Sequence, residues 1–341
     1  MSAEFNDEQI SMQHGSGGQA TRRLVDGLFA AALSNDVLDA MGDAAILSAG
    51  GLRLAMTTDT FVVSPHTFPG GSIGSLAVHG TVNDLAVSGA EPIGLTAGFV
   101  LEAGLEVEQL REQVRAMSDA AREAGVSVIA GDTKVVENGR ADGMYINTAG
   151  VGLVREEARL DPALVQPGDA VLVSGPIGDH GIAIMIARDE IDIESDLGSD
   201  SRSVLPLTRA LIDTLGSSIR WMRDATRGGV ATVLNELAES SRAGVIVEEA
   251  AVPLRDEVRG ACELLGLDPL HVANEGQFIA VVDGSRADEA LDALGGVSGG
   301  ESACRIGTIT EEHRGRVIGQ TEFGGKRVID VLVGDPLPRI C

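Results

Sequence analysis

Residues 80–92 read GTVNDLAVSGAEP, an apolar segment with Asn83 and Asp84 in its middle. An aspartate between an apolar segment and a turn or helix start is often an N-cap, because its carboxylate accepts a backbone hydrogen bond. Four more aspartates have this context: Asp43 in MGDAAIL, Asp59 in TTDT, Asp132 in AGDTK and Asp224 in MRDATRGG. Five together also suit Mg²⁺ and phosphate, because hard cations prefer carboxylate oxygens. Capping and a shared metal–phosphate site both stay open.

Helix and strand patterns alternate on both sides of this segment. Apolar residues three or four positions apart predict a helix at 107–124. Residues 126–130, VSVIA, are expected to form a short buried strand leading into GDTK. A Pro-, Gly- and Asp-rich join at 161–171 separates two α/β halves of similar size. The pattern predicts an α+β protein made of two α/β domains.

The predicted boundaries divide the chain into four parts. A mobile glycine-containing segment is expected at 1–20 and a flexible tail with a reactive cysteine at 334–341. The two domains are expected at 21–158 and 159–333.

Composition limits the possible partners and the location. There are 51 acidic and 26 Lys or Arg residues, a net charge of −25, which argues against nucleic acid, because phosphate binding needs a basic surface. No apolar run approaches the ~20 residues that span a bilayer, so no membrane partner is expected. Three distant cysteines form no disulfide framework or zinc site. We expect a cytoplasmic protein.

Three glycine-rich loops and one lysine could bind an anion. HGSGG at 14–18, FPGGSIG at 68–74 and TRGG at 226–229 could each turn N–H groups toward phosphate, or form plain turns. Lys134 follows the predicted buried strand, where an ammonium needs an anionic partner unless it reaches the surface.

Glu275 and Cys341 could carry out chemistry. Glu275 lies in the polar turn HVANEGQF and could be a general base or a turn cap. Cys262 and Cys304 are expected to be core residues. Cys341 follows Pro336 and Pro338, which favour an extended segment. It is either a nucleophile at the tip of an arm or an incidental cysteine.

Several motifs together resemble a known family. GTVNDLAVSGAEP, GDTKVV, DATRGG and ANEG, with a final PRIC, are similar to the HypE carbamoyl dehydratases of hydrogenase maturation. Their superfamily is the PurM-like, AIR synthetase-related ATP-binding proteins. The resemblance covers the chain after residue 11. It implies two PurM-like domains, of which the N-terminal one binds ATP with Mg²⁺ and forms a β-rich homodimer interface.

The resemblance also implies a reaction and its partners. A carbamoyltransferase, HypF, would carbamoylate Cys341, and ATP would drive dehydration of this group to a thiocyanate. Transferring a phosphoryl group to the amide oxygen makes phosphate the leaving group. The cyanide would then pass to iron on a HypC–HypD complex, for a [NiFe] hydrogenase. The alternatives are another PurM-like enzyme that phosphorylates a small-molecule amide or acid, and a non-catalytic scaffold whose tail docks partners.

Each candidate residue receives a role from this resemblance. Catalysis is assigned to Cys341, Lys134 and Glu275. Metal and ATP binding are assigned to Asp43, Asp59, Asp84, Asp132 and Asp224. Further ATP contacts are assigned to Gly17, Gly18, Asn83, Thr133 and Lys134.

Overall fold

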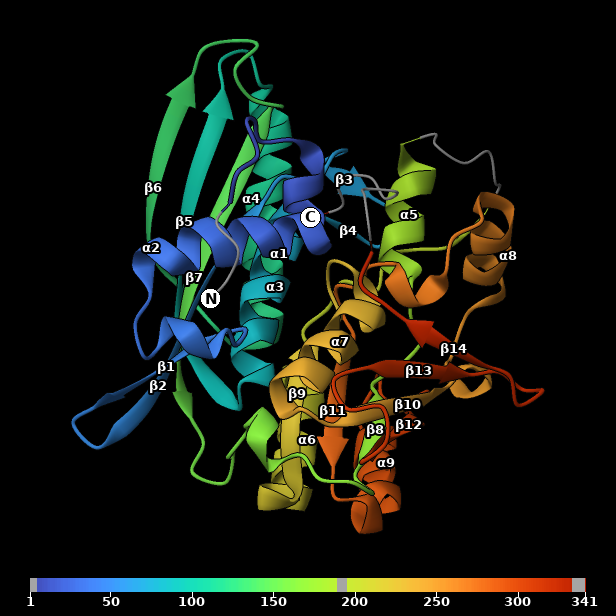
Figure 1. Ribbon diagram of the computed structural model, residues 1–341. Coiled ribbons are helices and arrows are strands. Elements are labelled where there is room, and N and C mark those ends of the chain that lie inside the picture. The colour runs from blue at the N-terminus through green and yellow to red at the C-terminus, as the bar shows by residue number, and fades with distance from the viewer. Residues whose placement is uncertain (1–4, 189–194, 333–340) are drawn as a thin grey trace.

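The computed structural model describes residues 5–188, 195–332 and 341, and it has two α/β halves that lie side by side (Figure 1). The predicted tail at 334–341 therefore lies outside the described residues, except for Cys341. The strands of the first half are β1 (Ala45–Ala49), β2 (Leu52–Phe61), β3 (Thr67–Phe68), β4 (Gly71–Ser72), β5 (Ala90–Glu102), β6 (Val128–Val136) and β7 (Met144–Val154). Its helices are α1 (Gln19–Leu24), a π-helical turn (Val25–Ala30), α2 (Ala31–Leu33), α3 (Ile73–Val87) and α4 (Val107–Ala124).

The first domain is a five-stranded sheet in the order β1-β2-β7-β5-β6. The pair β5–β6 is parallel and the other pairs are antiparallel. Helix α3 packs on strands β2, β5 and β7, and α4 packs on α3. Strand β6 is at the edge of the sheet and is exposed along nearly its whole length. The expectation of a buried strand here is wrong for the single chain, because within the part of the chain that the structure describes neither a further strand nor a covering helix completes its burial.

Helix α3 is the centre of this domain and carries Asp84. It is buried on nearly every face, as its apolar sequence requires. Ser72 caps its N-terminus by accepting from the N–H of Ser75. A Cβ on Gly74 would lie 2.1 Å from the carbonyl oxygen of Gln113, so a glycine is needed where α3 crosses α4.

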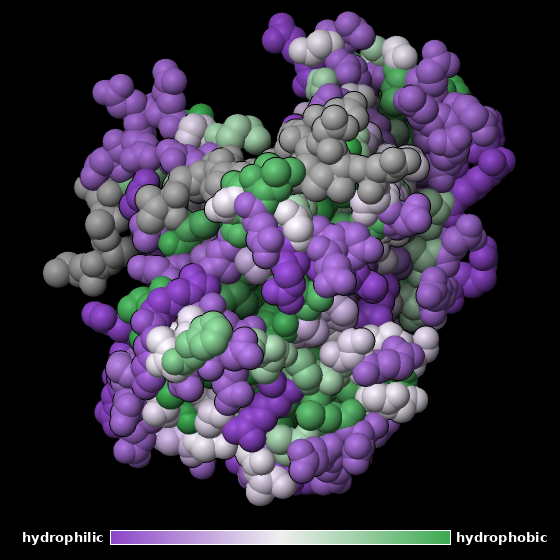
Figure 2. All heavy atoms as spheres, turned by 90° about the vertical axis from the view of Figure 1, so that its right-hand side faces the viewer, coloured by the Kyte–Doolittle hydropathy of each residue, from purple (hydrophilic) through white to green (hydrophobic). Residues whose placement is uncertain are grey.

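The second domain is a seven-stranded sheet in the order β14-β13-β10-β12-β8-β11-β9. Its strands are β8 (Ala170–Val173), β9 (Ile219–Asp224), β10 (Gly244–Glu248), β11 (Phe278–Val282), β12 (Cys304–Thr310), β13 (Val317–Gln320) and β14 (Lys326–Ile329). Its helices are α5 (Asp179–Ala187), α6 (Leu205–Leu215), α7 (Gly229–Ser241), α8 (Asp256–Leu265) and α9 (Ala287–Gly295). Hydrophilic side chains cover most of the face that Figure 2 shows. Among the described helices, none has the length and apolar character needed to cross a membrane.

Both ends of the described chain reach the region between the domains. In the N-terminal segment, His14 is buried, and its Nε2 lies 2.9 Å from Asp7. The segment that leads to the tail is fixed by three hydrogen bonds. Asn235 Nδ2 lies 3.1 Å from the Ile329 oxygen, His271 Nε2 lies 2.9 Å from the Asp330 oxygen, and the Gln19 N–H donates to the Leu332 oxygen at 3.1 Å.

Candidate active site

Four of the five predicted aspartates converge between the two domains. Asp43 precedes β1, Asp59 is on β2, Asp84 is on α3 and Asp224 ends β9. Carboxylate oxygens of Asp43, Asp84 and Asp224 all lie within 4.8 Å of one another, and Asp59 shares a hydrogen bond with Asp84. We call these four residues the aspartate cluster. Asp84 lies inside the last turn of α3, so it is not an N-cap.

Burial makes this concentration of negative charge unfavourable without a cation. It raises the pKa of Asp43 to about 6, and Arg223, whose Nε lies 2.9 Å from Asp43, opposes the shift. Burial and the neighbouring carboxylates raise the pKa of Asp84 and of Asp224 well above their usual value. A carboxylate in the last turn of a helix also faces the negative end of the helix dipole. The cluster therefore has the properties of a site for a divalent cation.

Glu275 lies next to the aspartate cluster and is held through its backbone. Asp200 accepts hydrogen bonds from the N–H groups of Glu275 and Gly276 at 3.0 and 3.3 Å. Asn83 Nδ2 donates to the Glu275 oxygen at 3.1 Å, and Asn83 Oδ1 accepts from the Val204 N–H at 2.8 Å. Both ends of the Asn83 amide are thus bonded to backbone, so its position supports Glu275 more directly than a nucleotide. Burial, with Asp224 and Asp200, raises the pKa of the Glu275 carboxyl well above its usual value.

Cys341 lies in the same site, partly buried against the hydrophobic core. Burial raises the pKa of its thiol to about 11, while Arg227 opposes this shift and Glu275 and Asp59 add to it. The thiol is therefore protonated at neutral pH in this position. Its neighbours Glu275 and Asp59 place it near the aspartate cluster, and its role as a substrate thiol stays a prediction.

Arg227 is a residue of this site that the sequence analysis did not assign. It belongs to the TRGG loop, of which only the backbone N–H groups were predicted to bind an anion. The interaction with Cys341 in its ionised form is the largest influence that raises the pKa of the Arg227 guanidinium. An arginine inside a glycine loop of so acidic a chain was the signal that could have identified it.

Gly17 and Gly18 lie against this arginine. Gly17 has a φ of 79°, and a Cβ there would lie 2.9 Å from Arg227 Cβ. The Gly17 N–H donates to Thr21 Oγ1 at 2.9 Å, and Gly18 precedes the first residue of α1. The two glycines are therefore at the site, and their contact with ATP stays a prediction.

Asp132, Thr133 and Lys134 lie apart from the other candidates, on the exposed strand β6. We call these three residues the β6 motif. Lys134 Nζ is 2.5 Å from Asp132 Oδ2, and the two side chains are 68% and 72% exposed. That hydrogen bond lowers the pKa of Asp132, opposite to the shifts in the aspartate cluster.

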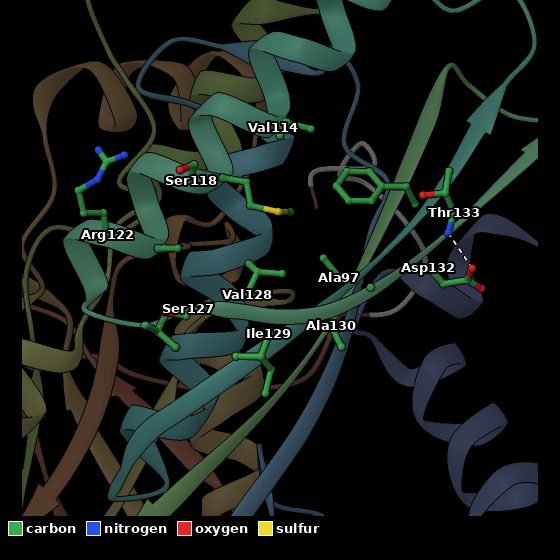
Figure 3. Close-up of a pocket in the computed structure, with 15 residues that line it drawn as sticks. Ala97, Val114, Ser118, Arg122, Ser127, Val128, Ile129, Ala130, Asp132 and Thr133 are labelled. Carbon is green, nitrogen blue, oxygen red and sulfur yellow. Dashed lines mark hydrogen bonds between the residues drawn. The ribbon is translucent and has the colours of Figure 1, made fainter.

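A cavity of about 1080 Å³ lies beside the β6 motif, between β6, β5 and α4. In Figure 3, Val114 and Ser118 on α4 lie across this cavity from Val128 and Ile129 on β6, with Asp132 and Thr133 toward one end. Most of its lining is apolar. The β6 motif thus borders an open apolar surface, and the aspartate cluster is not part of its lining.

Comparison with known families agrees with the fold and the site. Residues 41–154 match the family model of the AIR synthase related protein, N-terminal domain, and residues 166–320 match that of the C-terminal domain. The fold and site thus define a two-domain protein of the AIR synthase related class. Carbamoyl dehydratase HypE of Rhizobium leguminosarum bv. viciae is 47% identical over 98% of this chain and 95% of its own length. HypE of Escherichia coli is 44% identical over 97% and 99%. The chain belongs to the HypE carbamoyl dehydratase family.

Solved structures give the same relationship. HypE in complex with ATP superposes with a TM-score of 0.82 at 44% identity, covering 98% of this chain and 100% of that one. HypE from a HypE–HypF complex superposes with a TM-score of 0.87 at 43% identity, covering 91% and 99%. Thiamine monophosphate kinase of Aquifex aeolicus, at 20% identity and a TM-score of 0.67, shares the fold.

Proposed function

We propose that this protein uses ATP to dehydrate an S-carbamoyl group on Cys341 to a thiocyanate, releasing ADP and phosphate. The thiocyanate would supply cyanide ligands for the iron of a [NiFe] hydrogenase. The observation that carries this function is a thiol in the same site as a cluster of buried carboxylates and Glu275. Membership of the HypE family and the likeness to HypE crystallised with ATP support it.

The chemistry assigns separate tasks to the groups of the site. The carbamoyl oxygen attacks the γ-phosphorus of ATP, and the bond to ADP breaks. The C–O bond then breaks as phosphate leaves with the bonding electrons, and two N–H protons depart to leave C≡N. Glu275 suits the removal of these protons, because a base with a raised pKa is effective near neutral pH. Positioning and charge neutralisation provide most of the remaining catalysis.

Mg²⁺ fits the aspartate cluster. Asp43, Asp84 and Asp224 offer oxygen ligands close to one another, the donor set that a hard cation prefers. Their raised pKa values reflect burial first and repulsion between the carboxylates second, and a bound cation would favour the ionised forms. When bound there, Mg²⁺ would neutralise phosphate charge. Asp59 would complete the site, and Gly17 and Gly18 would contact the phosphates.

A homodimer would bring the β6 motif to the aspartate cluster of a second copy. The exposure of Val128, Ile129 and Val135 supports this arrangement, because exposed apolar edge strands rarely stay uncovered. Asp132 and Thr133 would then contact Mg-ATP from the second copy, and Lys134 would stabilise the transferring phosphoryl group. It is exposed, and among the described residues its one ion pair is with Asp132, which leaves it available for this role.

The partners follow from the same reaction. A HypF-type carbamoyltransferase would load Cys341, and a HypC–HypD complex would accept the cyanide. The likeness to HypE taken from a HypE–HypF complex supports the first partner. A reducing, cytoplasmic setting would suit the free thiols of Cys262, Cys304 and Cys341.

Intact mass spectrometry tests this function directly. The full chain is incubated with carbamoyl phosphate, the carbamoyltransferase and Mg-ATP. We expect the protein to gain one carbamoyl group and then lose one water molecule. Cys341→Ser should show neither change, whereas Cys304→Ser, a matched control, should show both. Thiocyanate in the Cys341→Ser variant would refute the carrier role of this residue.

A further inference from the structure

The site contains more acid than base, and its two arginines are bonded differently. Arg223 forms two ion pairs, from Nε to Asp43 Oδ1 at 2.9 Å and from Nη1 to Glu236 Oε2 at 3.2 Å. Arg227 donates one hydrogen bond, from Nη1 to the Gly15 oxygen at 3.2 Å. Among the residues that the structure describes, its other N–H groups have no hydrogen-bond partner. Arg227 therefore has donors available for a ligand.

The backbone around Arg227 holds this side chain at the reacting group. Gly17 packs against the Cβ and main chain of Arg227, which restrains the start of the side chain. Negative charge at Cys341, Asp59, Glu275 and Asp84 raises the pKa of the Arg227 guanidinium, so these groups lie within electrostatic reach of it, and Arg227 is itself exposed to solvent. Gly228 and Gly229, directly after it, begin helix α7.

We propose that Arg227 is a catalytic residue that binds the phosphoryl group as it moves onto and off the carbamoyl oxygen of Cys341. This inference rests on the proposed function. A planar guanidinium can donate two parallel hydrogen bonds to phosphoryl oxygens, and it keeps its charge throughout. Arg227 thus transfers no proton: the two N–H protons leave toward Glu275 and solvent, while Arg227 stabilises the charge on the phosphoryl oxygens.

Arg227→Ala and Arg227→Lys test the proposal in the full chain with the carbamoyltransferase, carbamoyl phosphate and Mg-ATP. Carbamoylated and dehydrated protein differ in mass, so loading and dehydration are timed in the same spectra. We expect dehydration to slow about 10³-fold in Arg227→Ala and at least about tenfold in Arg227→Lys, as for arginines that stabilise phosphoryl transfer. Loading should keep its wild-type rate, and ATP affinity should change by no more than a few-fold. Arg314→Ala, at an exposed site, is the control.

Chemical rescue separates catalysis from a merely structural role. Guanidinium ion should restore part of the dehydration rate of Arg227→Ala, whereas urea, of the same shape but neutral, should not. Dehydration at the wild-type rate in either variant would overturn the proposal, as would equal losses in loading and dehydration or failure of guanidinium to rescue. If the alanine variant does not fold, Arg227→Lys decides. Wild-type protein that is loaded but never loses water would instead overturn the proposed function.

Discussion

The aspartate cluster and the β6 motif have opposite surroundings, although their sequence contexts are alike. Asp84 and Asp224 lie close together between the domains, and burial raises the pKa of both carboxyls. Asp132 is exposed on an edge strand, and its hydrogen bond with Lys134 lowers its pKa. Similar sequence contexts thus do not show which aspartates become buried together when the chain folds. Variants of both regions should therefore differ in activity, assembly and stability.

The largest effect is expected at the centre of the aspartate cluster. Asp84→Asn should slow dehydration by about 10³-fold or more, because an amide cannot neutralise a cation that holds the phosphates. Dehydration is followed by mass, and Mg-ATP binding by calorimetry. Asp36→Asn, in an exposed loop, is the matched control. Unchanged Mg-ATP binding in Asp84→Asn would remove the cluster from the nucleotide site.

A mixed dimer tests whether the β6 motif acts in a second copy. Asp84→Asn and Lys134→Ala should each be inactive as homodimers. Random co-assembly should recover about a quarter of wild-type activity, because half of the dimers are mixed and each of these has one intact site. Activity of the co-expressed, purified mixture is compared with that of each variant alone. No recovery would place Lys134 in the site of its own chain.

The exposed apolar residues of β6 should govern assembly. Ile129→Asp should convert a dimer into a monomer and weaken ATP binding by about tenfold, because a buried charge without a partner disrupts an interface. Light scattering after gel filtration measures the mass. Leu264→Asp, at an equally exposed position on α8, should leave the mass unchanged. A dimeric Ile129→Asp protein would show that the interface lies elsewhere.

The buried carboxyl of Asp200 should make the stability of the protein depend on pH. Burial raises the pKa of Asp200 to about 6, so the folded form binds its proton more tightly than the unfolded form. The stability this provides is present below pH ~4 and is lost as pH rises through ~6, about 3 kcal/mol for a shift of roughly two pKa units. Asp200→Asn should therefore flatten the fall in stability between pH 4 and 6, as measured by urea unfolding. An unchanged slope would contradict the assigned burial.

The smallest effect is expected at Lys134. Lys134→Ala should leave the urea midpoint of the protein unchanged, because an exposed ion pair contributes little to stability. The same variant should nevertheless lose dehydration activity. A large drop in stability would mean that the Asp132–Lys134 pair has a structural function.

Much of the fold follows from local patterns in the sequence. The spacing of apolar residues predicts α4, and the structure has this helix at Val107–Ala124, followed by Gly125 with a φ of 70°. Cys262 is buried in α8 and Cys304 is on β12, as expected for core residues. Four of the five aspartates meet because each ends or interrupts an apolar element, which is visible in the sequence.

The burial of β6, the partners of Asn83 and the position of Arg227 depend on contacts between residues far apart in the sequence, which local patterns do not predict. The apolar residues of β6 predict burial, but they do not say whether the same chain provides the cover. Asn83 lies beside Asp84 in the sequence, yet its amide bonds distant backbone at Val204 and Glu275. Arg227 enters the site only because residues 15–17 and Cys341 approach it from far along the chain.

Hydrogen bonds to the backbone oxygens of Ile329, Asp330 and Leu332 hold the chain just before the segment that ends in Cys341. Nine residues, 333–341, follow Leu332, and whatever path they take they span at most about 30 Å. Under the proposed function, any partner that acts on Cys341 must therefore place its own reaction centre within that distance of Leu332. The docking geometry of each partner is thus restricted by a length that can be counted on the printed sequence.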